Sequence, residues 1–268
     1  MKESFRYKRE KMHNNLLKIR MEKILELFEK GDKERGKELL DEVVSVSKNE
    51  INNLIDKDED SVDGENINRS IFPKAGEVFA EGEKVRLIAI YDKEKYIATV
   101  RHYSQRKRLY DNESFVKTMW DDVCYKDCFA CGIYLHDGKY IGYCFVDDVR
   151  HSTYEIAIEL EPEYCNKGYG TEAIRIFIEN VAKVTGKKKF YARVELDNYA
   201  SQKMMKKVGG YPNGIRELLL FGEELEMFKE ENKHLITDKM REVAKEFSME
   251  AEEMLGYVLV YEFDLGKE

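Results

Sequence analysis

Gly168 and Gly170 are the residues whose type and spacing most directly suggest chemistry in this chain. They lie where an alternating strand pattern, residues 155–160, gives way to a helical pattern that starts near Ala173. A helix N-terminus presents backbone N–H groups and the positive end of its dipole, and glycines leave these groups uncovered. The pattern therefore predicts a loop, residues 166–171, that binds the phosphates of a ligand containing a pyrophosphate.

A dinucleotide site is one interpretation of this loop. Residues 168–173 fit G-x-G-x-x-G/A, and Glu195 and Asp197 follow at about the distance of a ribose-binding acid. However, Glu155 and Glu159 make the preceding strand too polar for an inner parallel strand covered on both faces. No series of strand–helix units follows to complete a doubly wound sheet. A dinucleotide-binding oxidoreductase is therefore the remote alternative.

A second interpretation rests on two blocks of sequence. The run YCNKGYGTEA at 164–173 resembles the acetyl-CoA loop of the GNAT superfamily of N-acetyltransferases, whose core pattern is Q/R-x-x-G-x-G/A. About 25 residues later, DNYAS at 197–201 and KVGGY at 207–211 resemble the next block of that superfamily. There an Asn and a Ser open a helix that ends in K-x-G-F. The branch closest to this chain is the ribosomal-protein N-terminal acetyltransferase-like one, and the resemblance extends over about residues 85–268.

The resemblance implies an acetyl-CoA-dependent N-acetyltransferase in which a primary amine attacks the thioester directly. It implies that backbone N–H groups at about Glu159 and Leu160 stabilise the oxyanion. Glu155 is the leading candidate for the general base and Glu159 is the second, with Glu195 at lower weight; a structural hydrogen bond is the competing role for Glu155. The expected acetyl-CoA-binding residues are Leu160, Asn166, Lys167, Gly168, Tyr169, Gly170, Thr171, Asn198 and Ser201.

Three departures from the family pattern bear on activity. Cys165 replaces the Gln or Arg of the loop, and Gly210 stands where an aromatic residue is usual. Met205 occupies the position of a Tyr that many relatives use as general acid, although the branch named above also lacks it. A CoA thiol has a pKa of about 8.5 and leaves readily, so this Tyr is not essential. The departures keep open a non-catalytic acyl-CoA-binding sensor or scaffold of the same fold.

Net charge, hydropathy and cysteine content indicate the class of protein. The net charge of −8 argues against nucleic acid and anionic membranes as partners. No run approaches 18 apolar residues and no signal peptide is recognisable, so a cytoplasmic protein is expected. Five cysteines form an odd set, which predicts reduced thiols. Cys124, Cys128 and Cys131 lack a second Cys or His pair at zinc-finger spacing, and no metal is expected.

The N-terminal part of the chain has a different pattern. Residues 8–56 carry two apolar helical stripes separated by Gly31-Asp32, which predicts a helical hairpin. Its apolar faces need a partner, which is the downstream domain, a second copy in a homodimer, or another protein. Residues 57–83 are acidic and are predicted to be a linker. The expected division is a helical extension with linker, residues 1–80, and an acetyltransferase domain, residues 85–268.

The order of the remaining elements predicts an α+β fold. Strands are expected at 86–91, 129–135, 140–146, 155–160, 190–196 and 257–263, with helical or irregular chain at 92–127 and a helical insertion at about 212–254. Asp137-Gly138 is a strong hairpin signal. The chain should thus form a mixed, mostly antiparallel GNAT-type sheet flanked by helices. Ala200, Met204 and Val208 are expected on the inner side of the helix that follows Asn198.

Overall fold

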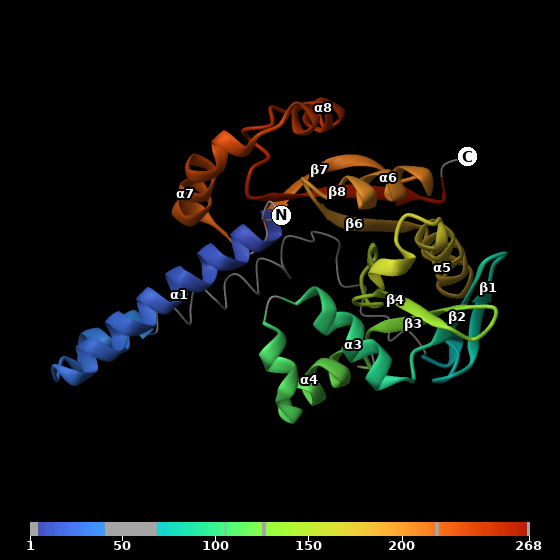
Figure 1. Cartoon of the computed structure of the whole chain (residues 1–268), viewed down its shortest axis with the longest axis horizontal. Coiled ribbons are helices and arrows are strands. Elements are labelled where there is room, and N and C mark those ends of the chain that lie inside the picture. Colours follow the sequence, from blue (N-terminus) through green and yellow to red (C-terminus); the bar gives the residue numbers. More distant parts are fainter. Residues whose placement is uncertain (1–4, 41–68, 105, 125–126, 218–219, 267–268) are drawn as a thin grey trace. The chain divides into compact units, whose positions relative to one another are not determined.

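The computed structural model describes residues 5–40, 69–104, 106–124, 127–217 and 220–266 (Figure 1). Its backbone contacts divide the chain into two compact units. The first unit comprises Met1–Ser61, Glu195–Asp197 and Ile215–Leu259, and the second comprises Val62–Val194, Asn198–Gly214 and Val260–Glu268. The domain boundary expected near residue 80 stays a prediction.

Five consecutive antiparallel strands form most of the sheet in the second unit. They are β1 Val78–Glu81, β2 Val85–Ala89, β3 Phe129–Leu135, β4 Tyr140–Val146 and β5 Tyr154–Leu160. The β3–β4 turn confirms the predicted hairpin, because Gly138 has a φ of 88° and donates its N–H to Leu135. A left-handed φ of this kind is what the Asp-Gly pair supplies.

The pairing of the strands changes from antiparallel to parallel after β5. Strand β6, Lys189–Glu195, lies parallel to β5, and the eight strands have the order β1-β2-β3-β4-β5-β6-β8-β7. Strand β8 spans Tyr257–Asp264 and β7 spans Tyr211–Glu217 at the edge. The predicted α+β fold with a mixed, mostly antiparallel sheet is confirmed.

Helices cover both faces of the strands in the second unit. Phe129 of β3 stacks on Phe177 of α5, Tyr169–Thr185, with ring centroids 5.9 Å apart. The next residue, Ala130, packs instead in a buried cluster with Tyr96 of α3, Lys93–Tyr103. Because successive side chains of a strand point to opposite faces, α5 and α3 lie on opposite sides of the sheet. The other helices of this unit are α4 Glu113–Val123 and α6 Tyr199–Lys207, with short 3₁₀ turns at Arg69–Ile71, Lys107–Asp111 and Pro162–Tyr164.

The first unit is mainly helical. Helix α1, Phe5–Glu29, ends before Gly31, whose φ of 81° confirms the predicted break, and residues 33–40 are helical again. The guanidinium of Arg9 is only 1% exposed; it pairs with Glu195 and donates to the carbonyl of Gly256 at 2.8 Å. The unit also contains α7 Gly222–Asn232, a 3₁₀ turn at Lys233–Leu235 and α8 Asp238–Glu246. The second predicted apolar stripe continues past Leu40, and the part after Leu40 lies outside the described residues.

Three expectations for local structure were wrong. Residues 78–81 form β1 rather than part of a linker, since they pair with β2. Residues 211–217 form β7 before the helical insertion begins. The buried face of α6 is made by Gln202 and Met205, whereas Ala200 is exposed and Met204 and Val208 are half-buried. No helix among the described residues is long and apolar enough to cross a membrane.

Candidate active site

Strand β5 presents different chemistry on its two faces. A Cβ on Gly170 of α5 would lie 3.2 Å from a methyl group of Leu160 and 3.7 Å from one of Ile158, so these side chains face α5. Glu159 faces the other side, where the hydroxyl of Tyr143 donates to its carboxylate at 2.7 Å. The ring of Tyr143 in turn contacts Tyr96 of α3. The two expected base candidates, Glu155 and Glu159, therefore lie on the α3 face.

The predicted glycine loop directly precedes α5. Gly168 is the N-cap residue with a φ of 88°, and Asn166 also has a left-handed backbone, with a φ of 60°. Asn166 and Lys167 are exposed, Tyr169 and Thr171 are half-buried, and Gly170 is buried. At Gly170 a Cβ would also lie 3.0 Å from the sulfur of Met204, so the helix start is packed closely from one side. The loop thus leaves backbone N–H groups of a 17-residue helix uncovered for an anion.

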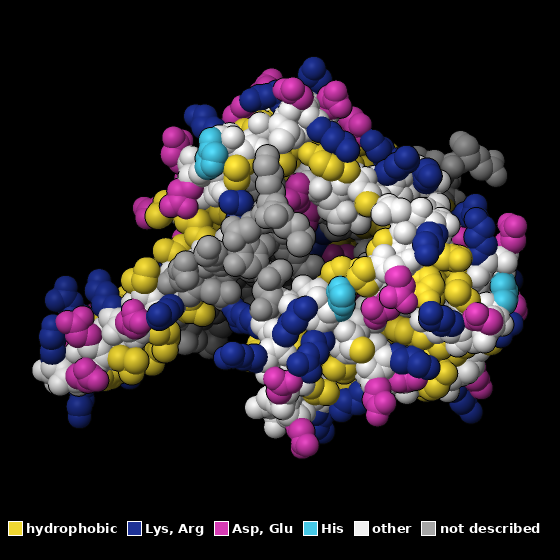
Figure 2. Space-filling view, in the orientation of Figure 1, with side chains coloured by type: hydrophobic (Ala, Val, Ile, Leu, Met, Phe, Trp, Pro, Cys, Tyr) yellow, Lys and Arg dark blue, Asp and Glu magenta, His cyan; other side chains and the backbone are white. Residues whose placement is uncertain are grey.

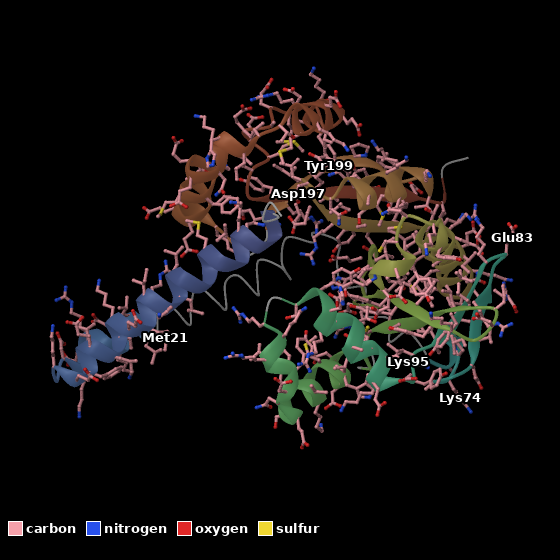
Figure 3. All side chains as sticks on the ribbon, in the orientation of Figure 1. Met21, Lys74, Glu83, Lys95, Asp197 and Tyr199 are labelled. Carbon is pink, nitrogen blue, oxygen red and sulfur yellow. The ribbon has the colours of Figure 1, made fainter. Side chains whose placement is uncertain are left out.

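Helix α6 brings Asn198 and Ser201 to the same region. Asn198 caps the helix, because its side-chain oxygen accepts the N–H of Ser201 at 3.1 Å. The contact between Met204 and Gly170 places α6 beside the first turn of α5. Figure 3 labels Tyr199, the first residue of α6. This cap uses the side-chain oxygen of Asn198 and leaves its NH₂ group for a ligand.

The opening between β5 and β6 is the second element of the site. The parallel pairing includes only Tyr154 with Phe190 and Glu155 with Tyr191. Beyond these residues the described strands are no longer paired, although β5 continues to Leu160. Alternate residues of a strand direct their N–H and C=O groups to each neighbour, so the later half of β5 presents backbone groups to this opening.

Glu155 is the last residue of β5 that pairs with β6, so it lies at the closed end of this opening. Its carboxylate accepts from Nε of Arg193 at 2.6 Å and from the hydroxyl of Tyr191 at 3.1 Å. Burial alone lowers the pKa of Arg193, but the adjacent Glu155 carboxylate raises it overall. The side chains of the pair are 18% and 25% exposed, for Glu155 and Arg193 respectively. This is the structural hydrogen bonding that was the competing role for Glu155.

Glu159 stands at the open end, next to Leu160 and the glycine loop. Burial, together with the Glu159 charge, raises the pKa of Tyr143 well above its usual value, so the hydroxyl keeps its proton and remains a donor to Glu159. Glu155 is four residues away along the strand, which corresponds to roughly 13 Å. The structure therefore separates the two predicted base candidates and places only Glu159 beside the predicted oxyanion position.

Sequence reasoning missed Tyr103, Tyr143 and Arg193. Tyr103, the last residue of α3, donates its hydroxyl to the carbonyl of Leu160 and lies 3.9 Å from the sulfur of Cys165. These residues come from segments without a recognisable motif, and only the strand pairing and the packing of α3 bring them to the site. Residues Cys131 and Cys144 are fully buried on paired strands, where burial raises the pKa of both thiols.

Comparison with known proteins connects this geometry to a family. Residues 84–210 match the model described as an acetyltransferase (GNAT) domain. No curated protein matches the chain. The match includes the glycine loop, the opening between β5 and β6 and the capped start of α6. The expected GNAT resemblance is thereby confirmed.

Several solved structures have a similar fold. RimL, a ribosomal L7/L12 α-N-protein acetyltransferase in complex with coenzyme A, has a TM-score of 0.50 and 10% identity, covering 72% of this chain and 100% of its own. RimJ from Mycobacterium smegmatis, with CoA-disulfide, has a TM-score of 0.46 and 14% identity, covering 68% and 82%. Spermidine N-acetyltransferase from Vibrio cholerae, with CoA and spermine, has a TM-score of 0.48 and 12% identity, covering 69% and 98%.

Proposed function

Because the chain carries a GNAT acetyltransferase domain over residues 84–210, we propose that it transfers an acetyl group from acetyl-CoA to a primary amine by direct attack. One observation supports this proposal most: the backbone pairing between β5 and β6 ends after Glu155, and the unpaired part of β5 leads to the glycine loop. An extended thioester cofactor needs both an anion site for its phosphates and unpaired backbone for its amides. Both lie within one segment here, residues 156–171.

The residues present fit such a cofactor. The N–H groups of Asn166–Thr171 would hold the pyrophosphate, and the absence of a side chain at Gly168 permits close approach. Backbone groups of β5 near Leu160 and the side-chain amide of Asn198 would hold the pantetheine arm. When bound, the thioester supplies an activated acetyl group.

Glu159 is the proposed general base. An ammonium with a pKa near 10.4 must lose a proton before it can attack, and a carboxylate can receive it directly or through one water. Glu159 lies on the opposite face from α5, so an amine approaching from the α3 side meets it beside Leu160. Tyr143 orients the carboxylate. Glu155 instead fixes Arg193 and the register of β5 and β6.

Met205 occupies the position on α6 where many relatives have a tyrosine that acts as general acid. Met205 is only 4% exposed and packs under the helix, where it has no proton to donate. The departing thiolate is a weak base that solvent can protonate, so activity does not require this group. A non-catalytic acyl-CoA-binding protein would also tolerate Met205 in place of the tyrosine. The experiment below distinguishes such a protein from an acetyltransferase.

The acceptor is proposed to be an amine on a small molecule or at a protein N-terminus. An amine panel that includes a polyamine, an aminoglycoside and an N-terminal peptide would be incubated with acetyl-CoA, and released CoA thiol would be measured. Turnover with one class, abolished in a Gly168→Val variant, supports the proposal. Binding of acetyl-CoA without turnover for any amine supports the sensor alternative, and absence of acetyl-CoA binding rejects both.

A further inference from the structure

Glu172 is a buried carboxylate in the first turn of α5, where an anion site is proposed. Its side chain is 6% exposed, and Oε1 accepts the backbone N–H groups of Lys84 at 2.7 Å and Val85 at 3.3 Å. A Cβ on Gly82 would overlap this oxygen, so a larger residue there would displace the Glu172 carboxylate. Glu172 therefore fixes the turn between β1 and β2 against the start of α5.

This attachment fixes the backbone from which the side chain of Lys84 extends. The Nζ atom of Lys84 is 3.7 Å from the position that a Cβ on Gly168 would take. Gly168 is the N-cap of α5, so the ammonium stands over the phosphate-binding loop. Among the described residues, no ion pair joins Lys84 to a carboxylate. Figure 3 labels the neighbouring Glu83 at the tip of this turn.

Two other ammonium groups lie near the loop. Nζ of Lys167 is 5.6 Å from the centroid of the Tyr164 ring, and Nζ of Lys139 is 5.0 Å from the same ring. Lys139 also lies 3.8 Å from Glu163, which offsets its charge. In a chain with a net charge of −8, this concentration of lysines at one helix N-terminus is a local positive field.

The loop also lacks the Gln or Arg side chain that its family pattern supplies for a phosphate. Cys165 stands at the Gln or Arg position, and its sulfur is directed towards the carbonyls of Leu160 and Glu161, at 4.0 and 3.8 Å. A thiol in this place adds no charge for a phosphate. Lys84 reaches the loop from a turn 84 residues earlier than Gly168, outside the motif, and brings a positive charge next to it.

We propose that Lys84 is a phosphate-binding residue of the acetyl-CoA site, contributed by the β1–β2 turn and fixed there by Glu172. This inference rests on the proposed function. The recognised chemistry is a phosphate dianion or pyrophosphate, and coenzyme A offers two sources: the pyrophosphate bridge and the 3′-phosphate.

Lys84→Gln is the test, with Lys74→Gln as the matched control. Both lysines are exposed, and Lys74 lies before the start of β1 whereas Lys84 follows its end. Affinities of the full chain for CoA, acetyl-CoA and 3′-dephospho-CoA would be measured by calorimetry at low and high salt. We expect Lys84→Gln to weaken CoA binding about five- to tenfold at low salt, as one charge-assisted contact implies. High salt should reduce the difference, and Lys74→Gln should bind as the wild type does.

The outcomes separate the two claims. An equal loss for CoA and 3′-dephospho-CoA assigns Lys84 to the pyrophosphate, and a loss confined to CoA assigns it to the 3′-phosphate; both support the inference. Unchanged CoA affinity of Lys84→Gln overturns it while leaving the proposed function intact. Failure of the wild type to bind any of these compounds overturns both. In kinetics, Lys84→Gln should raise KM for acetyl-CoA and leave kcat unchanged.

Discussion

The assignment of Glu159 rather than Glu155 as base yields a sharp prediction, because the two residues lie on the same face of one strand. Glu159→Gln and Glu155→Gln are both isosteric and remove one negative charge. The first keeps an acceptor for the hydroxyl of Tyr143. The second removes the charge that faces Arg193 at 2.6 Å. The pair therefore separates loss of proton acceptance from loss of a structural ion pair.

The size of each effect follows from the structure. At pH 7.4 an amine with a pKa of about 10.4 is neutral in about one molecule in a thousand. Without a base, only this fraction reacts, so Glu159→Gln should lower turnover by about 10²–10³-fold with an unchanged melting temperature. Glu155→Gln should cost about 1–3 kcal/mol, because Arg193 is only partly exposed and loses its charged partner. Its turnover should fall less than tenfold.

The assay is released CoA thiol against pH for the acceptor identified above, together with thermal unfolding. In Glu159→Gln the rate should rise about tenfold per pH unit up to pH 10, since solution deprotonation of the amine becomes limiting. The wild type should have a flatter profile. A normal pH profile and turnover in Glu159→Gln, with a collapse of turnover in a folded Glu155→Gln protein, would refute the assignment.

Three further predictions concern the rest of the chain. At a hundredfold excess over Kd, acetyl-CoA should stabilise the wild type by about 2.7 kcal/mol, and Gly170→Val should abolish this stabilisation. The variant should also destabilise the free protein, because a Cβ at this position lies 3.0 Å from the sulfur of Met204. An unchanged thermal shift with acetyl-CoA would contradict this prediction. Arg9→Met should cost about 3–5 kcal/mol in denaturant titrations. Arg20 is 43% exposed and pairs with the partly exposed Glu224, so Arg20→Met should cost at most about 1 kcal/mol; equal costs would be inconsistent with the burial of Arg9. Burial raises the pKa of Tyr154 to about 12, so its contribution to stability is complete below the unfolded value of 10 and falls by about 1.36 kcal/mol per pH unit from pH 10 to 12, a slope that Tyr154→Phe should remove from urea titrations at these pH values.

Local patterns in the sequence predicted the elements that local physics decides. The alternation in residues 155–160, the Asp137-Gly138 turn and the break at Gly31 each depend on residues within a few positions, and each was confirmed. Strand β7 was missed because Pro212 and Gly214 signal a break, although an edge strand tolerates both. Strand β1 is only four residues long, and its pairing with β2 rather than its composition makes it a strand.

The site was only partly predictable for a related reason. The glycine loop is contiguous, and its placement before α5 follows from its own residues. By contrast, Glu155 acquires Arg193 as a partner through the register of two parallel strands, which no local pattern encodes. The same holds for Lys84, which a buried carboxylate on α5 attaches to the loop. Long-range pairing therefore decides which charged residues are structural and which remain for chemistry.

The buried arginine of α1 has a consequence for the order in which the chain folds during synthesis. Arg9 and the carbonyl that it contacts are separated by 247 residues. At roughly 5–20 residues per second, the ribosome needs about 12–50 s to supply that partner. During this interval α1 carries apolar side chains that remain exposed even in the finished protein, such as Ile19 at 59% and Leu25 at 57%. Figure 2 shows hydrophobic side chains, in yellow, on the surface along α1.

The second unit has no such delay for most of its strands. Strands β1 to β5 are sequential antiparallel neighbours and can pair as they emerge. The first unit, by contrast, draws on three separate stretches of chain and closes only after Gly256 has been made. The nascent protein is therefore expected to hold a partly folded second unit and an uncovered N-terminal helix for tens of seconds. Holding chaperones would act on that helix during this interval.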